Sequence, residues 1–314
     1  MASSDRPVRP FTRLVDGLVH AYAPAAETVG VLSPAAVFRP AAGDRILGHT
    51  VAADLGRAYC ATPDAVVCLT AEGAEAWRSR FEPAADHRYG THPACELSAD
   101  GRVLWVYRPD ELAGRGRPDQ WVAVDAATGA VLDRTDLETA GHGGVHLVHP
   151  SSGEVLLGVG EGQDGTVVHR GSLTGGRLDL VRYPWVDRCL VDLSPDGHRF
   201  LTVDHQQTDL AVHAHPGGEV LFTLTVDAFG HDPDTACLEW CGGFLTPDVL
   251  VVALVGETED EEEWFRHYRV DARSGRVLGG FDARAADAYD LRPLGDGSWL
   301  TADASGHPVR RAAS

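Results

Sequence analysis

Short apolar runs separated by polar turns fill most of the chain. The runs are rich in Val, Leu, Phe and Tyr and are the length of single strands, as in residues 103–107 (VLWVY) and 121–124 (WVAV). Asp-Gly, Thr-Gly and Gly-Gly pairs lie between many of them and indicate hairpin turns. The best helical candidate, residues 71–90, occupies the place of the last hairpin of its repeat, so we interpret it as strand and loop. The pattern predicts an all-β protein.

The strand pattern repeats along the chain with a nearly constant period. One turn in each unit marks the period, and the second residues of these turns are Gly56, Gly101, Gly153, Gly197, Asp248 and Gly297. The steps between them run from 44 to 52 residues. Each unit holds four strand-sized runs, most clearly in residues 95–137 and 189–226. A period of this length is typical of propellers and other repeat folds.

Two local motifs resemble the WD40 and YVTN type of β-propeller. Residues 194–197 read Ser-Pro-Asp-Gly, as in the family pattern, and Gly-His pairs precede strands at His49, His142 and His231. The Trp-Asp dipeptide that names the WD40 family is absent, so the resemblance is to the superfamily. It implies four-stranded blades arranged radially, which leave only short, protected edges.

The resemblance covers nearly the whole chain and implies a single propeller domain over residues 1–314. Residues 287–313 offer two or three strands, and residues 13–34 offer a hairpin. Together these terminal segments would make one composite blade that closes the ring. Six blades is therefore the favoured number, and seven is the alternative if the N-terminal segment forms a blade of its own.

Composition and charge exclude several classes of function. The chain has 46 acidic and 27 basic residues, a formal charge of −19 and no Lys. Such a surface is unsuited to nucleic acid, and the missing Lys excludes pyridoxal-phosphate chemistry and a Walker-type phosphate loop. We find neither a secretory signal nor a membrane span, and the six cysteines lack the spacing of a disulfide scaffold. We therefore expect a cytoplasmic protein that binds neither nucleic acid nor membranes.

Histidines near the starts of first strands are one set of candidate site residues. His92, His142, His146 and His231 would lie near one end of the channel, where neutral imidazoles can bind a divalent metal ion. His146 is the candidate general base. The resembled family uses its Gly-His histidine structurally, so a structural role is the alternative for His49, His142 and His231.

Carboxylates from three units form a second candidate set. Glu96 and Asp192 occupy the same place in their strands, and Glu239 corresponds to them. Three carboxylates facing one channel would suit Ca²⁺, Mg²⁺ or Mn²⁺. Lactonases of the gluconolactonase type use a comparable metal site but include an Asn ligand, and this chain has no Asn. The alternative is that these carboxylates bond to backbone or to Arg.

Two long, oppositely charged loops give a third clue. Residues 108–120 carry three Arg, and residues 256–263 carry six acidic residues, whereas the corresponding loops of other units are short. The leading hypothesis is a binding protein whose loop-bearing face holds a protein or peptide partner by charge complementarity. The alternative is a metal-dependent hydrolase or lyase with a small-molecule substrate and its site at the mouth of the channel.

Overall fold

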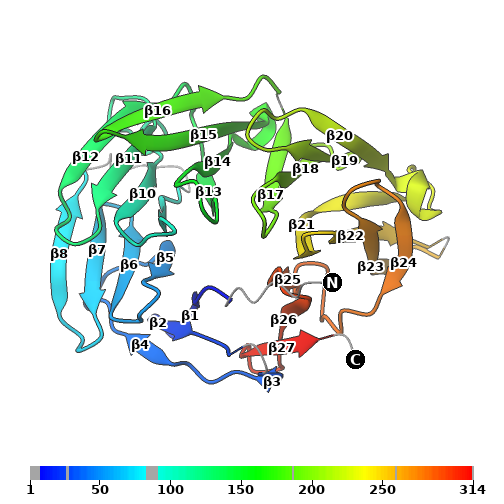
Figure 1. The fold of residues 1–314 in the computed structure, drawn as a ribbon, viewed down its shortest axis with the longest axis horizontal. Helices are drawn as coiled ribbons and strands as arrows, with labels where there is room; N and C mark the ends of the chain where they lie inside the picture. Colours follow the sequence, from blue (N-terminus) through cyan, green and yellow to red (C-terminus); the bar gives the residue numbers. More distant parts are fainter. Residues whose placement is uncertain (1–7, 26–27, 83–90, 186, 259, 313–314) are drawn as a thin grey trace. The chain divides into compact units, whose positions relative to one another are not determined.

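The computed structural model describes residues 8–25, 28–82, 91–185, 187–258 and 260–312. Over these residues the strands form seven antiparallel sheets, six with four strands and one with three (Figure 1). These are the blades of a seven-bladed β-propeller, which confirms the predicted all-β propeller fold. Contacts between residues group the chain into two compact units, and we describe each by itself.

The first unit comprises Arg9–Ala23 and Ser33–Val186 and holds four sheets. Its three-stranded sheet is β1 (Phe11–Val15), β2 (Leu18–Tyr22) and β4 (Ala36–Phe38). The next is β5 (Gly48–Val51), β6 (Arg57–Thr62), β7 (Ala65–Thr70) and β8 (Glu75–Arg80). It is followed by β9 (Ala94–Leu97), β10 (Val103–Arg108), β11 (Gln120–Asp125) and β12 (Val131–Asp136). The last is β13 (Gly143–Val148), β14 (Val155–Gly160), β15 (Thr166–Thr174) and β16 (Arg177–Arg182), with a 3₁₀ turn at Gly162–Asp164.

The second unit is built mainly from Pro24–Leu32 and Asp187–Ser314 and holds three sheets. One is β17 (Arg188–Leu193), β18 (Arg199–Asp204), β19 (Asp209–Ala214) and β20 (Val220–Thr225), followed by a 3₁₀ turn at Val226–Phe229. The next is β21 (Ala236–Thr246), β22 (Val249–Glu257), β23 (Glu263–Asp271) and β24 (Val277–Phe281). The third is β25 (Arg292–Pro293), β26 (Ser298–Ala302), β27 (Pro308–Ala312) and β3 (Gly30–Val31).

The favoured count of six blades was wrong, and the alternative of seven is correct. Residues 13–34 do not enter the closing sheet as a whole. Instead β1 and β2 form a hairpin that pairs with β4 in a sheet of its own. Only β3 pairs with the C-terminal strand β27, so the two terminal segments do share one sheet, as predicted. The added sheet depends on β4, which is too short to register as a strand in the sequence pattern.

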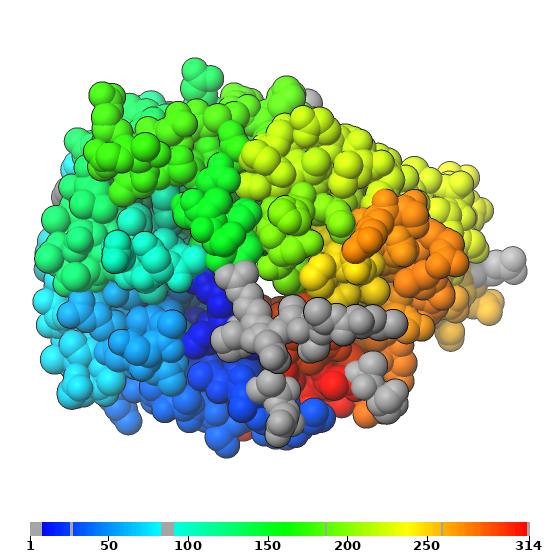
Figure 2. All heavy atoms as spheres, in the orientation of Figure 1, coloured from blue at the N-terminus to red at the C-terminus, as the bar shows by residue number. Residues whose placement is uncertain are grey.

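The core lies between neighbouring sheets of each unit. In the first unit, Tyr59 of β6 and Cys95 of β9 belong to one buried cluster. Trp105 and Trp121, from β10 and β11, belong to another cluster together with residues of β14. On the face that Figure 2 shows, the atoms of the sheets β5–β8 and β9–β12 adjoin one another without an open gap. The middle strands are buried on both faces, which explains their continuous apolar runs.

The outermost strands are more polar and more exposed than the middle strands. Strand β8 has the sequence EAWRSR and lies where residues 71–90 were interpreted as strand and loop. Residues 83–90 of that segment lie outside the described residues. No helix in the described part of the chain is long and apolar enough to cross a membrane.

Candidate functional site

The three predicted carboxylates each have a different set of partners. Glu96, in the first unit, accepts a hydrogen bond from Thr50 Oγ1 at 2.9 Å. Asp192, in the second unit, accepts backbone N–H bonds from Phe244 at 2.7 Å and from Leu193 at 2.9 Å. Burial raises the pKa of Asp192 to about 6. The partners of Asp192 are backbone groups, one of the two kinds named in the alternative interpretation, whereas Glu96 bonds to a threonine hydroxyl.

The predicted histidines are also separated into different settings. His92 and His142 are both exposed, and the N–H of His92 donates to the carbonyl of His142 at 2.7 Å. His231 lies in the second unit, where its Nε2 is 2.6 Å from the hydroxyl of Tyr268 and its ring packs on Trp264. Burial, with a smaller contribution from Arg266, lowers the pKa of His231. Tyr268 and Trp264 belong to β23 of the sheet that His231 precedes.

His146 is bound through the nitrogen that a general base would use. The indole Nε1–H of Trp121 donates to His146 Nε2 at 3.1 Å, and the two ring centroids are 6.0 Å apart. Burial lowers the pKa of His146 to about 3, so its imidazole is neutral near pH 7. Because Nε2 accepts this bond, the ring proton lies on Nδ1.

No three His, Cys, Asp or Glu side chains within the described ranges are placed so that they could hold one metal ion. The predicted ligands Glu96, His92 and His142 lie in the first unit, and Asp192, Glu239 and His231 lie in the second. A metal-dependent hydrolase or lyase therefore stays a prediction.

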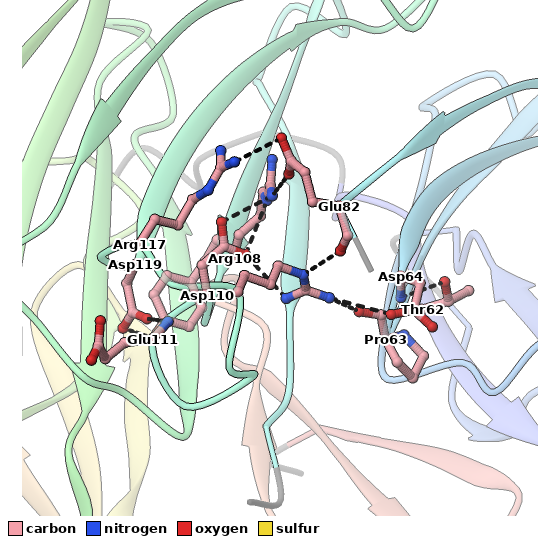
Figure 3. A network of polar contacts seen from close by, with 11 residues as sticks. Thr62, Pro63, Asp64, Glu82, Arg108, Asp110, Glu111, Arg117 and Asp119 are labelled. Atoms are coloured by element: carbon pink, nitrogen blue, oxygen red, sulfur yellow. Dashed lines mark hydrogen bonds and ion pairs between the residues drawn. The ribbon is translucent and has the colours of Figure 1, made fainter. Parts of the chain in front are cut away.

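The arginine-bearing loop is bound internally. Its three guanidinium groups, those of Arg108, Arg115 and Arg117, all meet acidic groups or carbonyls of the first unit (Figure 3). Arg108 pairs with Glu82 at 2.6 Å and with Asp110 at 2.9 Å. Arg117 pairs with Glu82 at 3.0 Å. The hydrogen bonds from Arg108 are the main cause that lowers the pKa of Glu82 to about 2.

Arg115 has the largest number of partners in this network. Only 1% of its side chain is exposed, and it pairs with Asp110 at 3.0 Å, which is itself fully buried. It also donates to the carbonyls of Pro63 at 2.7 Å and Glu82 at 2.6 Å. Arg115 therefore ties the loop to the turn between β6 and β7 and to the segment after β8. The buried charges of Arg115 and Asp110 therefore serve structure.

Asp119 closes the other end of the same loop. The residue is fully buried, and its Oδ2 accepts hydrogen bonds from the hydroxyls of Tyr107 at 2.7 Å and Thr139 at 3.0 Å and from the N–H of Gly141 at 2.7 Å. Its Oδ1 accepts from the N–H of Glu111 at 3.1 Å (Figure 3). One carboxylate thus fixes the loop to the segment that enters β13.

The acidic hairpin tip differs from the arginine-bearing loop. We give this name to the described acidic residues at the tip of the β22–β23 hairpin, Glu257, Asp260, Glu261, Glu262 and Glu263. All of them are exposed, and in the part of the chain that the structure describes they form no ion pair. Glu257 and Glu263 lie directly opposite each other in the strand register. Like charges in this position repel and destabilise the hairpin.

The first strand of the same sheet, β21, contains a large bulge. Leu238 pairs with Leu254, but the next pair is Gly242 with Val252, so three residues of β21 face one of β22. The backbone re-enters the ladder through Gly242 and Gly243, which have φ values of +112° and +143°. A Cβ at Gly242 would lie 2.3 Å from the carbonyl oxygen of Val251, so only Gly fits here.

The bulge presents Glu239 and Trp240 next to the turn between β18 and β19 and to the segment that precedes β25. Glu239 Oε2 accepts hydrogen bonds from Gln207 Nε2 at 3.0 Å and from the hydroxyl of Tyr289. Trp240 packs its ring on His205 with a centroid distance of 5.8 Å. In Figure 1, β21 lies between β17 and β25. We call these five residues the aromatic–acid site.

The aromatic–acid site includes one predicted residue, Glu239, and several that the sequence did not indicate. Trp240 is 40% exposed and Tyr289 is 55% exposed. Burial raises the pKa of Tyr289, and its hydrogen bond to Glu239 adds to this effect, so Tyr289 is a hydrogen-bond donor to that carboxylate near neutral pH. The Gly242-Gly243 pair was the one signal that could have indicated the bulge, because consecutive glycines inside a strand often mark one.

An open groove lies on the outer strands of the same sheet. It has a volume of about 440 Å³ and is lined by β23, β24 and the segment that follows β24, including Phe265, His267 and Phe281. His267 Nε2 lies 3.2 Å from the carbonyl of Ala288, which precedes Tyr289. His267 therefore connects the groove to the segment that carries Tyr289.

Comparison with known proteins supports the fold alone. No family model matches the chain, and no curated protein matches it. Among solved structures, BamB from Moraxella catarrhalis has a TM-score of 0.53 at 14% identity, covering 98% of this chain and 82% of that one. A functionally unknown protein from Desulfotomaculum acetoxidans has a TM-score of 0.55 at 10% identity, covering 97% and 94%.

An enzyme is also among the similar structures. Dihydro-heme d1 dehydrogenase NirN has a TM-score of 0.58 at 14% identity, and the match covers 95% of this chain but 58% of that chain. A propeller of this kind hosts both binding proteins and enzymes, so the fold does not decide between them. The chain has the β-propeller fold that these structures share.

Proposed function

We propose that this protein is a binding protein whose acidic hairpin tip holds a positively charged segment of a protein or peptide partner. The observation that supports this proposal is the contrast between the two long loops. The arginines of residues 108–120 are neutralised inside the first unit, whereas the tip of the β22–β23 hairpin keeps its negative charges exposed. Complementary charge increases both the rate and the specificity of association.

The acidic hairpin tip destabilises the folded hairpin, and this supports a role in binding. Glu257 and Glu263 face each other at the end of the β22–β23 pairing, where a pair of opposite charges would stabilise the hairpin. The net charge of −19 adds a long-range attraction for a basic partner. A sequence that placed charge there for solubility alone would not need like charges in register.

The test compares a basic peptide with an acidic peptide of the same length, both at low salt and at about 0.5 M salt, where exposed charges are screened. We expect the basic peptide to bind at low salt and to dissociate as salt is raised. The triple variant Asp260→Asn, Glu261→Gln, Glu262→Gln should lose this binding.

The matched control changes the same number of charges in the first unit. Glu72→Gln, Glu138→Gln and Asp179→Asn alter exposed acidic residues far along the chain from the tip. This control should bind the basic peptide almost as well as the wild type. Equal loss in the two triple variants would mean that only net charge matters, and the proposal would be wrong.

A further inference from the structure

We propose that the aromatic–acid site binds a single positively charged side chain, an arginine or a lysine of the partner, between the carboxylate of Glu239 and the indole of Trp240. This inference rests on the proposed function, because it names the chemistry by which the same unit would recognise a basic partner. Its evidence is separate, and it comes from β21 and its two neighbouring sheets.

The bulge in β21 exposes an aromatic ring that a regular strand would pair or bury. Trp240 is one of the three residues that leave the ladder, and 40% of its surface is exposed. A large exposed indole loses favourable burial, and bulges are common where a strand re-aims a side chain for function. Glycine at position 243 is also required, since a Cβ there would lie 2.3 Å from Asp192 Oδ2.

The indole ring is held in position before any ligand arrives. Its Nε1–H donates to the carbonyl of Asp204 at 3.1 Å, and one ring face lies near His205 with an interplanar angle of 21°. A preorganised ring loses little conformational entropy when it binds a ligand. Indole is the aromatic group with the strongest attraction for a cation over its face.

Glu239 supplies a carboxylate in which one of the two oxygens has no hydrogen-bond donor among the described residues. Its Oε2 accepts from Gln207 and Tyr289, which fix the carboxylate, while Oε1 has no hydrogen-bond partner among the described residues. No basic side chain in the described chain forms an ion pair with Glu239. A fixed carboxylate with a free oxygen is an acceptor for a guanidinium or ammonium group.

Two acidic residues close to Tyr289 in sequence have the same charge as Glu239. Asp287 and Asp290 flank Tyr289 in sequence, and Asp287 accepts the backbone N–H of Tyr289 at 2.8 Å. Trp240 and Tyr289 alone could also stack on a sugar ring. The carboxylate and the surrounding acidic residues favour a cation instead.

The experiment titrates the full chain with three small probes, N-acetyl-arginine amide, N-acetyl-lysine amide and N-acetyl-citrulline amide. Citrulline has nearly the shape of arginine but no charge. Binding is followed by the nuclear magnetic resonance signals of the indole N–H groups. We expect the arginine and lysine probes to shift one indole signal, and citrulline to bind at least about tenfold more weakly.

Variants assign the probe to the site. Glu239→Gln keeps an acceptor for Tyr289 and Gln207 but loses the charge, and it should weaken arginine binding about tenfold. Trp240→Leu should abolish the shifted signal, whereas Trp240→Phe should retain part of the affinity. Glu138→Gln, an exposed acid of the first unit, is the matched control and should bind like the wild type. Circular dichroism melting shows whether each variant is folded.

Two results would overturn the inference. One is equal binding of arginine and citrulline probes, which would point to a neutral ligand such as a sugar. The other is unchanged arginine binding in folded Glu239→Gln. Both are independent of the peptide experiment, because the probes are single amino acids. If binding of the basic peptide depends on the acidic hairpin tip but binding of the probes does not depend on Glu239, the proposed function is supported and this inference is wrong.

Discussion

Replacing Arg115 with Ala tests whether the arginine-bearing loop is structural. The variant removes a guanidinium that is 1% exposed and leaves the fully buried Asp110 with Arg108 as its remaining ion-pair partner. Breaking a buried ion pair by removing one partner costs about 3–5 kcal/mol. Because Arg108 still pairs with Asp110, we expect the lower end of this range, about 3 kcal/mol.

The matched control lies two residues away in the same loop. Arg117 makes one ion pair, to Glu82 at 3.0 Å, and its side chain is 30% exposed. Half-exposed pairs contribute about 0–1 kcal/mol, so Arg117→Ala should unfold almost like the wild type. Urea unfolding followed by circular dichroism measures both variants.

The pH dependence provides an independent check on Asp110. Burial raises its pKa, and the two arginines Arg108 and Arg115 counteract this effect. Without Arg115 the pKa of Asp110 rises further in the folded state. An acid with a raised folded pKa makes the fold more stable as the pH falls through that pKa. The loss of unfolding free energy in Arg115→Ala should therefore become smaller as the pH is lowered from 7. Equal unfolding free energies of Arg115→Ala and Arg117→Ala at pH 7 would refute the reasoning. So would a difference between Arg115→Ala and the wild type that grows on acidification.

Three further predictions concern single acidic residues. Asp119→Ala should destabilise the first unit by about 4 kcal/mol in urea unfolding, because the buried hydroxyl of Tyr107 and the other donors lose their acceptor. The folded pKa of Asp192, about 6, exceeds that of an unfolded Asp, so this residue should make the wild type about 1 kcal/mol more stable as the pH falls from 7 to 5. Asp192→Asn should lack this gain in unfolding free energy, and parallel pH profiles of the two proteins would contradict the prediction. Glu263→Gln should raise the thermal unfolding midpoint slightly, because it removes the repulsion between residue 263 and Glu257, and it should weaken binding of the basic peptide. An unchanged or lower midpoint would contradict this prediction.

The fold was predictable because its signal repeats. Strand-sized apolar runs and Asp-Gly turns recur in nearly every unit, and buried middle strands leave a strong mark on composition. The number of blades was not predictable, because it depends on the two-residue strand β3 and the three-residue strand β4. The turn Asp16-Gly17, with φ values of +50° and +75°, carried the missing signal of a seventh hairpin.

The candidate site was predictable only in part. The sequence placed Glu239 near the start of a first strand, and it marked the acidic hairpin tip as unusual. It could not show that Trp121 occupies the Nε2 of His146, or that Arg115 points into the protein. Those outcomes depend on contacts between residues far apart in sequence, for which a single chain carries no local pattern.

The pairing of β3 with β27 has a consequence for how the protein is made. The backbone carbonyl of Ala25 accepts a hydrogen bond from Arg310, 285 residues further along, and Leu32 donates to Pro308. At a translation rate of about 5–20 residues per second, the N-terminal strand waits roughly 15–60 s for its partner. During that interval the nascent chain carries an unpaired strand edge, which can pair with another chain.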